Sequence, residues 1–428
     1  MKRFWIGNLI ITLFVFFMMW GMSKLFDLKL LSAFDPIGQA LSDFEMTDYA
    51  FSNLRPDPKF EDRIVLVNIG NLGRMELAQQ LSIISKYKPR VIAIDSFFNC
   101  EGGLYDTLNC PQLKDTLANL FLANAIQEAG NVILVSKLLQ SDSLAQSGDI
   151  DIYDSVEYSD PHFSNFATNA FASLPTDAKY QEDVKQCRSL FPRVKVKGKN
   201  ELAFSVATAM KFDSMTTMGF LNRNKNEELI NYRGNFEIQE VKVNIDKDEI
   251  SSSGFTGMFT ALDIGDVLTE NFDSTLLKDK IVLMGFLGDY FGDPSWGDKF
   301  FTPLNKKVAG RANPDMFGLV VHANVIAMIL NEDYIDELKD WQEYAIAFIS
   351  CFLIVALFVE IDHKLPTWFD GLSVIIQLVL ILLISGLVIY GFAAWSLKLD
   401  LAITLTSIAF VGPCYDIFKS VENSLKKK

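Results

Sequence analysis

Residues 64–98 read IVLVNIGNLGRMELAQQLSIISKYKPRVIAIDSFF, and this stretch decides the fold. It begins with Ile64–Ile69, a short apolar run rich in β-branched side chains, which is typical of a strand buried in a parallel sheet. A Gly-rich turn follows, in which Asn71 could cap the helix that the next apolar spacing predicts. Val91–Ile94 predicts a second buried strand that ends at Asp95. We therefore expect one strand–helix–strand unit here.

The same alternation continues towards the C-terminus. Leu113–Ala129 has the spacing of an amphipathic helix closed by Gly130, and Val132–Val135 predicts a third strand. Three strands separated by helices form a βαβαβ unit, whose crossovers are almost always right-handed. Ile281–Gly285 resembles the first strand and is expected to re-enter the same sheet. The predicted fold class is an α/β exported domain with a mainly parallel sheet, plus a four-helix transmembrane region.

Other parts of the domain are less regular in sequence. Residues 137–200 are rich in Ser, Asp and Asn, and they predict a long insertion with little regular structure. Residues 24–55 are expected to form helix that packs on the domain near the membrane. The remaining expected elements are helices over Leu202–Met210, Ala261–Leu268 and Gly318–Leu330, and strands over Leu229–Tyr232 and Glu237–Val243.

Four apolar stretches predict membrane helices, one near the N-terminus and three near the C-terminus. Crossing a bilayer takes about 20 apolar residues, and Phe4–Ser23 and Gly371–Leu397 meet that length without a charged side chain. Tyr344–Val359 and Leu401–Tyr415 are shorter, which packing against neighbouring helices makes tolerable. The expected domains are an uncleaved anchor at 1–23, the exported domain at 24–342, spans at 343–361, 371–391 (with a turn at Gly391) and 399–418, and a basic tail at 419–428.

Basic residues beside the spans predict the orientation in the membrane. Lys2, Arg3, Lys364 and Lys419 fall on one side of a four-span arrangement, and loops rich in Lys and Arg usually stay in the cytoplasm. Lys398 lies in the short opposite loop, although two lysines just after the first span weaken the contrast. We expect a multi-pass protein of a bacterial cytoplasmic membrane, with both termini cytoplasmic and the main domain periplasmic or extracellular.

Charge and cysteine content narrow the partners. The net charge of −14 lies mainly in the exported domain and argues against nucleic acid, which attracts Lys and Arg. Cys100 and Cys110 bracket a Gly-rich loop, so a disulfide between them and a pair of free thiols are both open interpretations. CxxC spacing is absent from the sequence, and we expect no zinc site.

Ligands of open α/β sheets bind in the loops that follow the carboxyl ends of the strands. The most unusual of these loops is Phe286–Asp298, in which the aspartates either line a ligand or calcium site or cap their own backbone in a surface turn. Asp95 either serves a ligand or caps its turn, and His322 is either a ligand residue or a satisfied core side chain. The candidate ligand-binding residues are Asn71, Asp95, Asp289, Asp293, His322 and Asn324.

Motifs of common enzyme classes do not occur in the sequence. HExxH, GxSxG, GxGxxG and GxxxxGK[ST] are all absent, which removes the usual support for peptidase, hydrolase, dinucleotide and P-loop chemistry. We therefore expect no catalytic residues, no cofactor and no metal, in a protein that is not an enzyme. An enzyme built on Asp95 and the edge formed by Asp289–Asp298 is the lesser alternative.

Several segments of the exported domain match a known pattern in the same order. They are IVLVNIGNLGR and YKPRVIAIDSFF within 64–98, ELAFSVA at 201–207, LINYRGN at 229–235, and LLKDKIVLMGFLGDYFGD, FTPL and GLVVHANVIAMIL within 276–330. Through them the chain resembles the CHASE2 extracellular sensor domains of bacterial membrane receptors, whose span layout is also similar. The resemblance implies an exported sensory module, which in that family usually feeds a cytoplasmic kinase, cyclase or diguanylate cyclase.

The expected function follows from this resemblance and from one departure, because the sequence ends after its last span without an output domain. We expect a membrane-anchored sensor or binding module that takes an extracytoplasmic ligand or protein and acts through a partner membrane protein in the transmembrane bundle. The alternative is a structural or accessory subunit of a bacterial cell-envelope complex. Whether the chain forms a homo-oligomer stays open.

Overall fold

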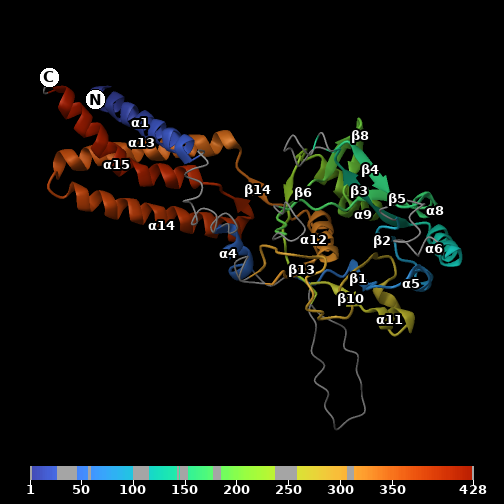
Figure 1. The fold of residues 1–428 in the computed structure, drawn as a ribbon. Helices are drawn as coiled ribbons and strands as arrows, with labels where there is room; N and C mark the ends of the chain where they lie inside the picture. The colour runs from blue at the N-terminus through green and yellow to red at the C-terminus, as the bar shows by residue number, and fades with distance from the viewer. Residues whose placement is uncertain are drawn as a thin grey trace, which may run out of the picture. The chain divides into compact units, whose positions relative to one another are not determined.

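The computed structural model divides the chain into two compact units (Figure 1). Unit 2 comprises Pro56–Tyr334, and unit 1 comprises Met1–Arg55 together with Ile335–Lys428. The residues that the structure describes are 2–26, 46–55, 59–99, 115–141, 144, 153–176, 185–236, 258–305 and 313–426.

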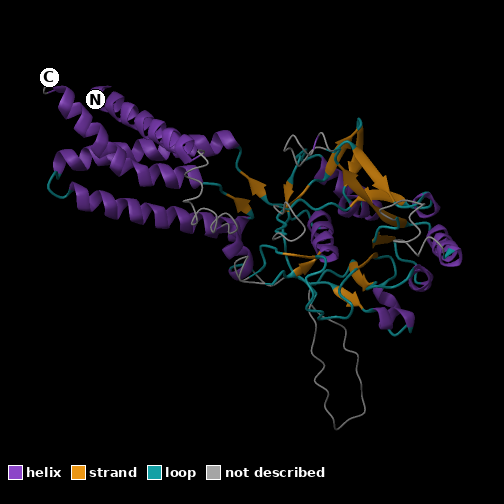
Figure 2. Ribbon diagram, in the orientation of Figure 1, coloured by secondary structure: helices purple, strands orange, loops and turns teal. Residues whose placement is uncertain are grey.

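Unit 2 is built on one mainly parallel sheet, as the sequence predicts (Figure 2). The strand order is β10-β1-β11-β2-β3-β4, and β5 also pairs with β3. All described pairings in this sheet are parallel except the one between β3 and β4. The strands are β1 (Ile64–Asn68), β2 (Val91–Asp95), β3 (Val132–Leu139), β4 (Ser155–Tyr158), β5 (Thr168–Phe171), β10 (Thr260–Leu262) and β11 (Ile281–Gly285).

The central position of β11 confirms that Ile281–Gly285 re-enters the sheet. It pairs with β1 from Ile64 to Asn68 on one side and with β2 from Val91 to Asp95 on the other. Every residue of β1 and β11 is buried, which explains why both segments are continuous apolar runs rather than alternating ones. β1 and β2 follow each other in sequence, but β11 separates them in space.

Helices cover both faces of this sheet. The side chains of Val65, Val67, Val282 and Met284 share one hydrophobic cluster with helices α5, α6 and α11. The alternate residues face the other way, where Leu319 of α12 packs against Gly285 and α9 packs against α12. The helices are α5 (Arg74–Lys86), α6 (Thr116–Ala129) and α11 (Ile264–Leu268) on one face, and α9 (Phe204–Phe212) and α12 (Gly318–Leu330) on the other.

The prediction that residues 137–200 lack regular structure is wrong for their described part. β3 continues to Leu139, and β4 and β5 pair with its two halves. These edge strands carry polar side chains on their exposed positions, so the segment lacks the apolar run that marks a central strand. Its other elements are α8 (Pro161–Ser164), β6 (Ser189–Leu190), β7 (Arg193–Val196) and β8 (Lys199–Leu202), and β6 pairs with β9 (Glu228–Leu229).

Three further expectations need correction. The segment predicted as a helix from Ala261 begins as strand β10, and the helix starts only after Asp263, which caps it. The strand predicted over Leu229–Tyr232 retains only its first residue, in β9. Asn71 does not cap α5, because that helix begins after Gly73. The strand predicted over Glu237–Val243 lies outside the described residues.

Unit 1 contains the apolar helices, which run side by side (Figure 1). Three described helices are long and apolar enough to cross a membrane, namely Phe4–Lys24 within α1 (Lys2–Phe26), α13 (Asp340–Lys364) and α14 (Phe369–Trp395). α15 (Ala402–Lys426) packs with them but is not among the three, so the structure supports the four-span arrangement only in part. The turn predicted at Gly391 is absent, because α14 continues to Trp395.

The described part of residues 24–55, which was predicted to pack on the α/β domain, contacts α14 within unit 1. It forms α4 (Met46–Asn53), whose Phe51 ring lies 4.9 Å from the ring of Phe392 in α14. α15 contains Pro413, which has no N–H and so leaves the carbonyl oxygen of Ala409 without its helical donor. Gln377 of α14 donates to that oxygen over 3.1 Å, and the two helices are thereby joined at the break.

Candidate functional site

The carboxyl end of the central strands is the first place to look for a site. β1 and β2 lead into α5 and α6 on one face of the sheet, whereas β11 leads into α12 on the opposite face. Such a divergence of neighbouring connections is the topological switch point at which open α/β sheets bind ligands. The end of β11 lies between the ends of β1 and β2, so the switch point lies there.

Two carboxyl groups lie at this switch point. Asp95 ends β2 and pairs in register with Gly285, and a Cβ atom added to Gly285 would lie 3.2 Å from the Cβ atom of Asp95. The carboxylate of Asp298 lies against the first residue of α12, at 3.3 Å from the place of a Cβ atom on Gly318. Glycine at these two positions therefore makes the room that the carboxyl groups occupy.

The environment of these carboxyl groups disfavours their charged forms. Burial, assisted by the charge of Asp298, raises the pKa of Asp95 to about 7. Burial also raises the pKa of Asp298 to about 6, while the charge of Lys185 opposes that rise. Asp298 keeps more solvent-exposed surface than the half-buried Asp95, so water screens it more and the larger rise falls on Asp95.

A buried asparagine that the sequence interpretation overlooked organises the loops at this edge. Asn68 ends β1, and its Nδ2 donates to Oδ1 of Asp263 over 2.9 Å and to the carbonyl oxygen of Gly288 over 3.0 Å. Its Oδ1 accepts from the backbone N–H groups of Gly70 and Leu287, at 3.0 and 2.9 Å. One side chain thus joins the loops after β1, β10 and β11. Its polar character inside the run IVLVNI was the available signal.

The structure brings three of the predicted residues together in the loops. The Nδ2 atom of Asn71 donates to Oδ1 of Asp289 over 2.5 Å, at an exposed position. Asp293 accepts from the backbone N–H groups of Asp289 and Ser295, and these bonds hold the pKa of Asp293 below its ordinary value. Asp293 therefore caps its own loop, as the interpretation of this segment as a surface turn expects. A ligand-binding role for these residues stays a prediction.

The two predicted residues of α12 are engaged inside the domain. His322 is 3% exposed and contacts the ring of Phe204 edge-on, and burial lowers its pKa to about 4. Asn324 accepts from the backbone N–H of Arg233 over 2.9 Å and donates to the carbonyl oxygen of Gly234 over 2.9 Å. Their contacts are those of structural groups, and neither lies with the loop residues at the switch point.

The remaining predictions on sites concern cysteines and metals. Cys100 and Cys110 lie outside the described residues. Cys187 is buried, and its thiol lies 3.7 Å from the carbonyl oxygen of Ser189. Within the described ranges, no group of three or more His, Cys, Asp or Glu side chains lies in an arrangement that could hold a metal ion.

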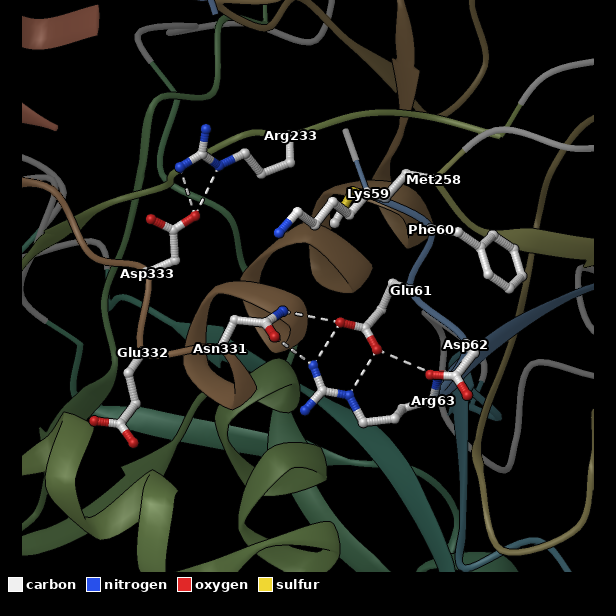
Figure 3. Close-up of a pocket in the computed structure, with 10 residues that line it drawn as sticks. All are labelled: Lys59, Phe60, Glu61, Asp62, Arg63, Arg233, Met258, Asn331, Glu332 and Asp333. Atoms are coloured by element: carbon white, nitrogen blue, oxygen red, sulfur yellow. Dashed lines mark hydrogen bonds and ion pairs between the residues drawn. The ribbon is translucent and has the colours of Figure 1, made fainter. Parts of the chain in front are cut away.

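A cleft of about 680 Å³ opens at the opposite, amino end of the sheet (Figure 3). Its walls come from the residues just before β1, from the loop after β9 and from the residues just after α12. It is lined by Lys59, Phe60, Glu61, Asp62, Arg63, Arg233, Met258, Asn331, Glu332 and Asp333. Cavities of this size are typical of small-molecule sites.

Two ion pairs stand in the walls of this cleft. Arg63 binds Glu61 through two parallel hydrogen bonds of 2.6 Å, and Asn331 bridges the pair with bonds of 2.9 Å to Glu61 and 2.7 Å to Arg63. Arg233 binds Oδ2 of Asp333 through Nε at 2.7 Å and Nη2 at 2.6 Å. The pair of Arg63 with Glu61 is bidentate, and such pairs are among the stronger polar contacts in proteins.

The first pair is electrostatically well compensated. Burial opposes ionisation of Glu61, but its hydrogen bonds with Arg63 and Asn331 and the charge of Arg63 together hold its pKa below the ordinary value. The hydrogen bond to Glu61 raises the pKa of Arg63 further. None of these residues was among the predicted site residues, because the cluster lies before the strands and not at their carboxyl ends. The run KFEDR directly before an apolar strand was its only signal.

Comparison with protein-family models identifies a family. The model described as the CHASE2 domain matches residues 14–358, a range that includes the whole of unit 2, part of α1 and most of α13. A search of curated proteins and a search of solved structures gave no match.

Proposed function

The chain belongs to the CHASE2 family of extracellular sensor domains, and from that premise we propose that it is a membrane-anchored sensor without catalysis of its own that acts through a partner membrane protein. In this proposal unit 2 lies outside the cytoplasm and binds the stimulus. The four helices α1, α13, α14 and α15 form the transmembrane bundle, with both termini in the cytoplasm.

The observation that carries this proposal is the extent of the family match. It does not stop at the α/β unit but continues into α1 at one end and into α13 at the other. The sensory module of the family therefore includes both chain connections to the apolar helices. A stimulus bound in unit 2 can act on those helices through these two connections.

The apolar helices offer a surface for a partner. Only 11% of the most apolar window of α14 is buried within the chain, compared with 28% for α13. The exposed side chains of α14 include Leu378, Leu382 and Leu383. A face of this kind contacts lipid or another membrane helix, and a partner that packs there would feel a shift of α14 in the bundle.

Native mass spectrometry of the chain extracted in mild detergent tests the proposal. We expect a stoichiometric complex with a second membrane protein, and we expect Leu378→Ala with Leu382→Ala to weaken it more than Ile349→Ala, an exposed site on α13. Detection of the chain as a monomer or homo-oligomer would contradict partner-mediated action. A large, stable assembly whose melting no extracytoplasmic solute shifts would favour the accessory-subunit alternative.

A further inference from the structure

We propose that the cleft at the amino end of the sheet binds a small zwitterion, such as a free amino acid or a short peptide. This inference gives the ligand class for the sensor proposed above, and its signalling consequence rests on that proposal. The binding step itself stands on the chemistry of the cleft walls alone.

The charges of the walls fall into two groups. Arg63, Glu61 and Arg233 are committed to the ion pairs described above, in which the side chain of Glu61 is only 6% exposed. The side chains of Lys59 and Glu332 make no hydrogen bond or ion pair with a residue that the structure describes. One cation and one anion of the cleft are therefore available to an occupant.

The available cation points into the open space. Figure 3 shows the Lys59 side chain reaching between the two ion pairs, with its ammonium group in the middle of the cleft. A ligand carboxylate placed there would also meet Arg233, whose Nη1 makes no bond to Asp333. Carboxylates bind ammonium and guanidinium groups through charge-assisted hydrogen bonds, so this wall suits the anionic end of a ligand.

Acceptors for a cationic group lie along the same cleft. Both bonds from Arg233 go to Oδ2 of Asp333, so Oδ1 of that partly exposed carboxylate has room for a further donor. Glu332 adds a second carboxylate at the edge of the cleft in Figure 3. A ligand ammonium group would be stabilised there, as an ion that leaves water requires.

Apolar surface completes the lining. Met258 is 5% exposed, and its backbone is fixed because its N–H donates to Asn235 and its carbonyl oxygen accepts from Glu61. Phe60 is 54% exposed and lies at the wall of the cleft. These two side chains offer contact to the aliphatic or aromatic part of an amino acid, where burial of apolar area adds affinity.

Ligands of a single charge fit the walls less well. Three cationic and four anionic side chains line the cleft. A simple anion would leave the Glu332 carboxylate without a counter-charge, and a simple cation would leave the Lys59 ammonium group without one. Only an occupant that carries both charges compensates both of the uncommitted groups, Lys59 and Glu332.

The position of the cleft in the chain gives binding a consequence. Its walls are the first residues of unit 2, Lys59–Arg63, and nearly the last, Asn331–Asp333, because the unit extends from Pro56 to Tyr334. A bound ligand therefore touches both segments through which unit 2 continues into the rest of the chain. The bridge from Arg63 to Asn331 already joins these segments, so an occupant would alter or reinforce that bridge.

Calorimetric titration of the full chain in detergent tests the inference. The probes are free amino acids and dipeptides, each compared with its N-acetylated and its C-amidated form, which lack one of the two charges. We expect binding of the zwitterions and at least a tenfold loss of affinity for either blocked form. No binding by any zwitterion of the panel, or equal binding of the blocked forms, would overturn the proposal.

Variants locate the site within the unit. Lys59→Gln and Glu332→Gln should each weaken binding at least tenfold without lowering the melting temperature of the unliganded protein. The matched controls are Lys195→Gln and Glu128→Gln, two exposed residues outside the cleft, which should leave the affinity unchanged. Binding that persists in both cleft variants would show that the zwitterion binds elsewhere.

The two proposals fail in different ways. If the cleft variants lose the ligand but the mass of the native complex and its response to stimulus do not change, the ligand site stands and the sensing role fails. If a partner complex responds to another solute while no zwitterion binds, the sensing role stands and the cleft assignment fails.

Discussion

The two ends of the central sheet deal with charge in opposite ways. At the carboxyl end, Asp95 and Asp298 lie near each other, and their pKa values are raised to about 7 and about 6. At the amino end, Glu61 is held by Arg63 and Asn331, and its pKa is lowered. Burial at the carboxyl end therefore disfavours the charged forms of Asp95 and Asp298, whereas the contacts of Glu61 at the amino end favour its charged form. The difference indicates which end suits a charged ligand at neutral pH.

The contacts that hold the loops also differ between the two ends of the sheet. The carboxyl end is held by Asn68, whose side-chain groups bond mainly to backbone. The amino end holds its loops through ion pairs and leaves Lys59 and Glu332 available. We conclude that the carboxyl end is built for rigidity and the amino end for recognition.

The largest effect is expected from Asn68→Ala at the carboxyl end. The change leaves two backbone N–H groups, one carbonyl oxygen and the cap residue Asp263 without their partner in a fully buried place. We expect a loss of about 3–4 kcal/mol and a melting temperature lower by roughly 10 °C. Thermal denaturation of the full chain in detergent measures it, with the exposed Asn222→Ala as control. A drop of less than about 2 °C would show that the loops are held by other contacts.

Glu61→Gln at the amino end should have the next largest effect. It leaves the Arg63 charge without its carboxylate, and we expect a loss of about 2 kcal/mol at pH 7, since the Arg63 side chain is about one-third exposed and water screens it. Because the pKa of Glu61 is lowered on folding, its contribution is present above the ordinary value and is lost as the pH falls through the folded-state pKa.

The melting difference between the wild type and Glu61→Gln should therefore vanish in acid. Glu128→Gln, on the exposed face of α6, is the control and should differ from the wild type at no pH. A difference that persists undiminished at low pH would mean that the shape of the side chain, and not its charge, stabilises the cleft.

Asp95→Asn should change stability in the opposite direction. The pKa of Asp95 is raised on folding, so its contribution is present below the ordinary value and is lost as the pH rises towards 7. The amide stays neutral, and we expect the variant to be more stable than the wild type by about 1 kcal/mol at pH 8 and equal to it near pH 3. Melting curves across this range measure it. Destabilisation at pH 8 would show that the Asp95 carboxylate has a stabilising partner.

The smallest effect is expected from Asn71→Ala. The bond from Asn71 to Asp289 is exposed, so water replaces it readily, and we expect a loss of about 0.5 kcal/mol or less. The shift in melting temperature should stay within about 2 °C, and the affinity of the zwitterion should not change. A loss of ligand affinity in this variant would place recognition at the carboxyl end and reverse the comparison.

The strands of the sheet that are buried on both faces were predictable from the sequence. Ile64–Asn68 and Ile281–Gly285 are continuous apolar runs for this reason, and the fold class followed from them. β4 and β5 were not predicted, because a strand at the edge needs apolar residues on one face only and therefore has no continuous apolar run. α12 was predicted to the residue, since all thirteen of its residues are buried and the run is unbroken.

The cleft was not predictable for a different reason. Several of its polar contacts join residues far apart in sequence, such as the ion pair of Arg233 with Asp333 and the hydrogen bond from Arg63 to Asn331, and no local pattern encodes such contacts. Asn324 was predicted as a ligand-binding residue, whereas the structure shows its side chain bound to the backbone groups of Arg233 and Gly234. Long-range polar contacts can be predicted only after the topology of the fold is known.

The central place of β11 also bears on how the protein is made. β1 ends at Asn68, and its neighbour β11 begins only at Ile281, so the middle of the sheet is synthesised after both of its flanking strands. Until that segment is synthesised, β1 and β2 present two open edges that would pair with other chains. We expect the nascent domain to need protection from a chaperone, and truncations before residue 281 to aggregate rather than to fold partially.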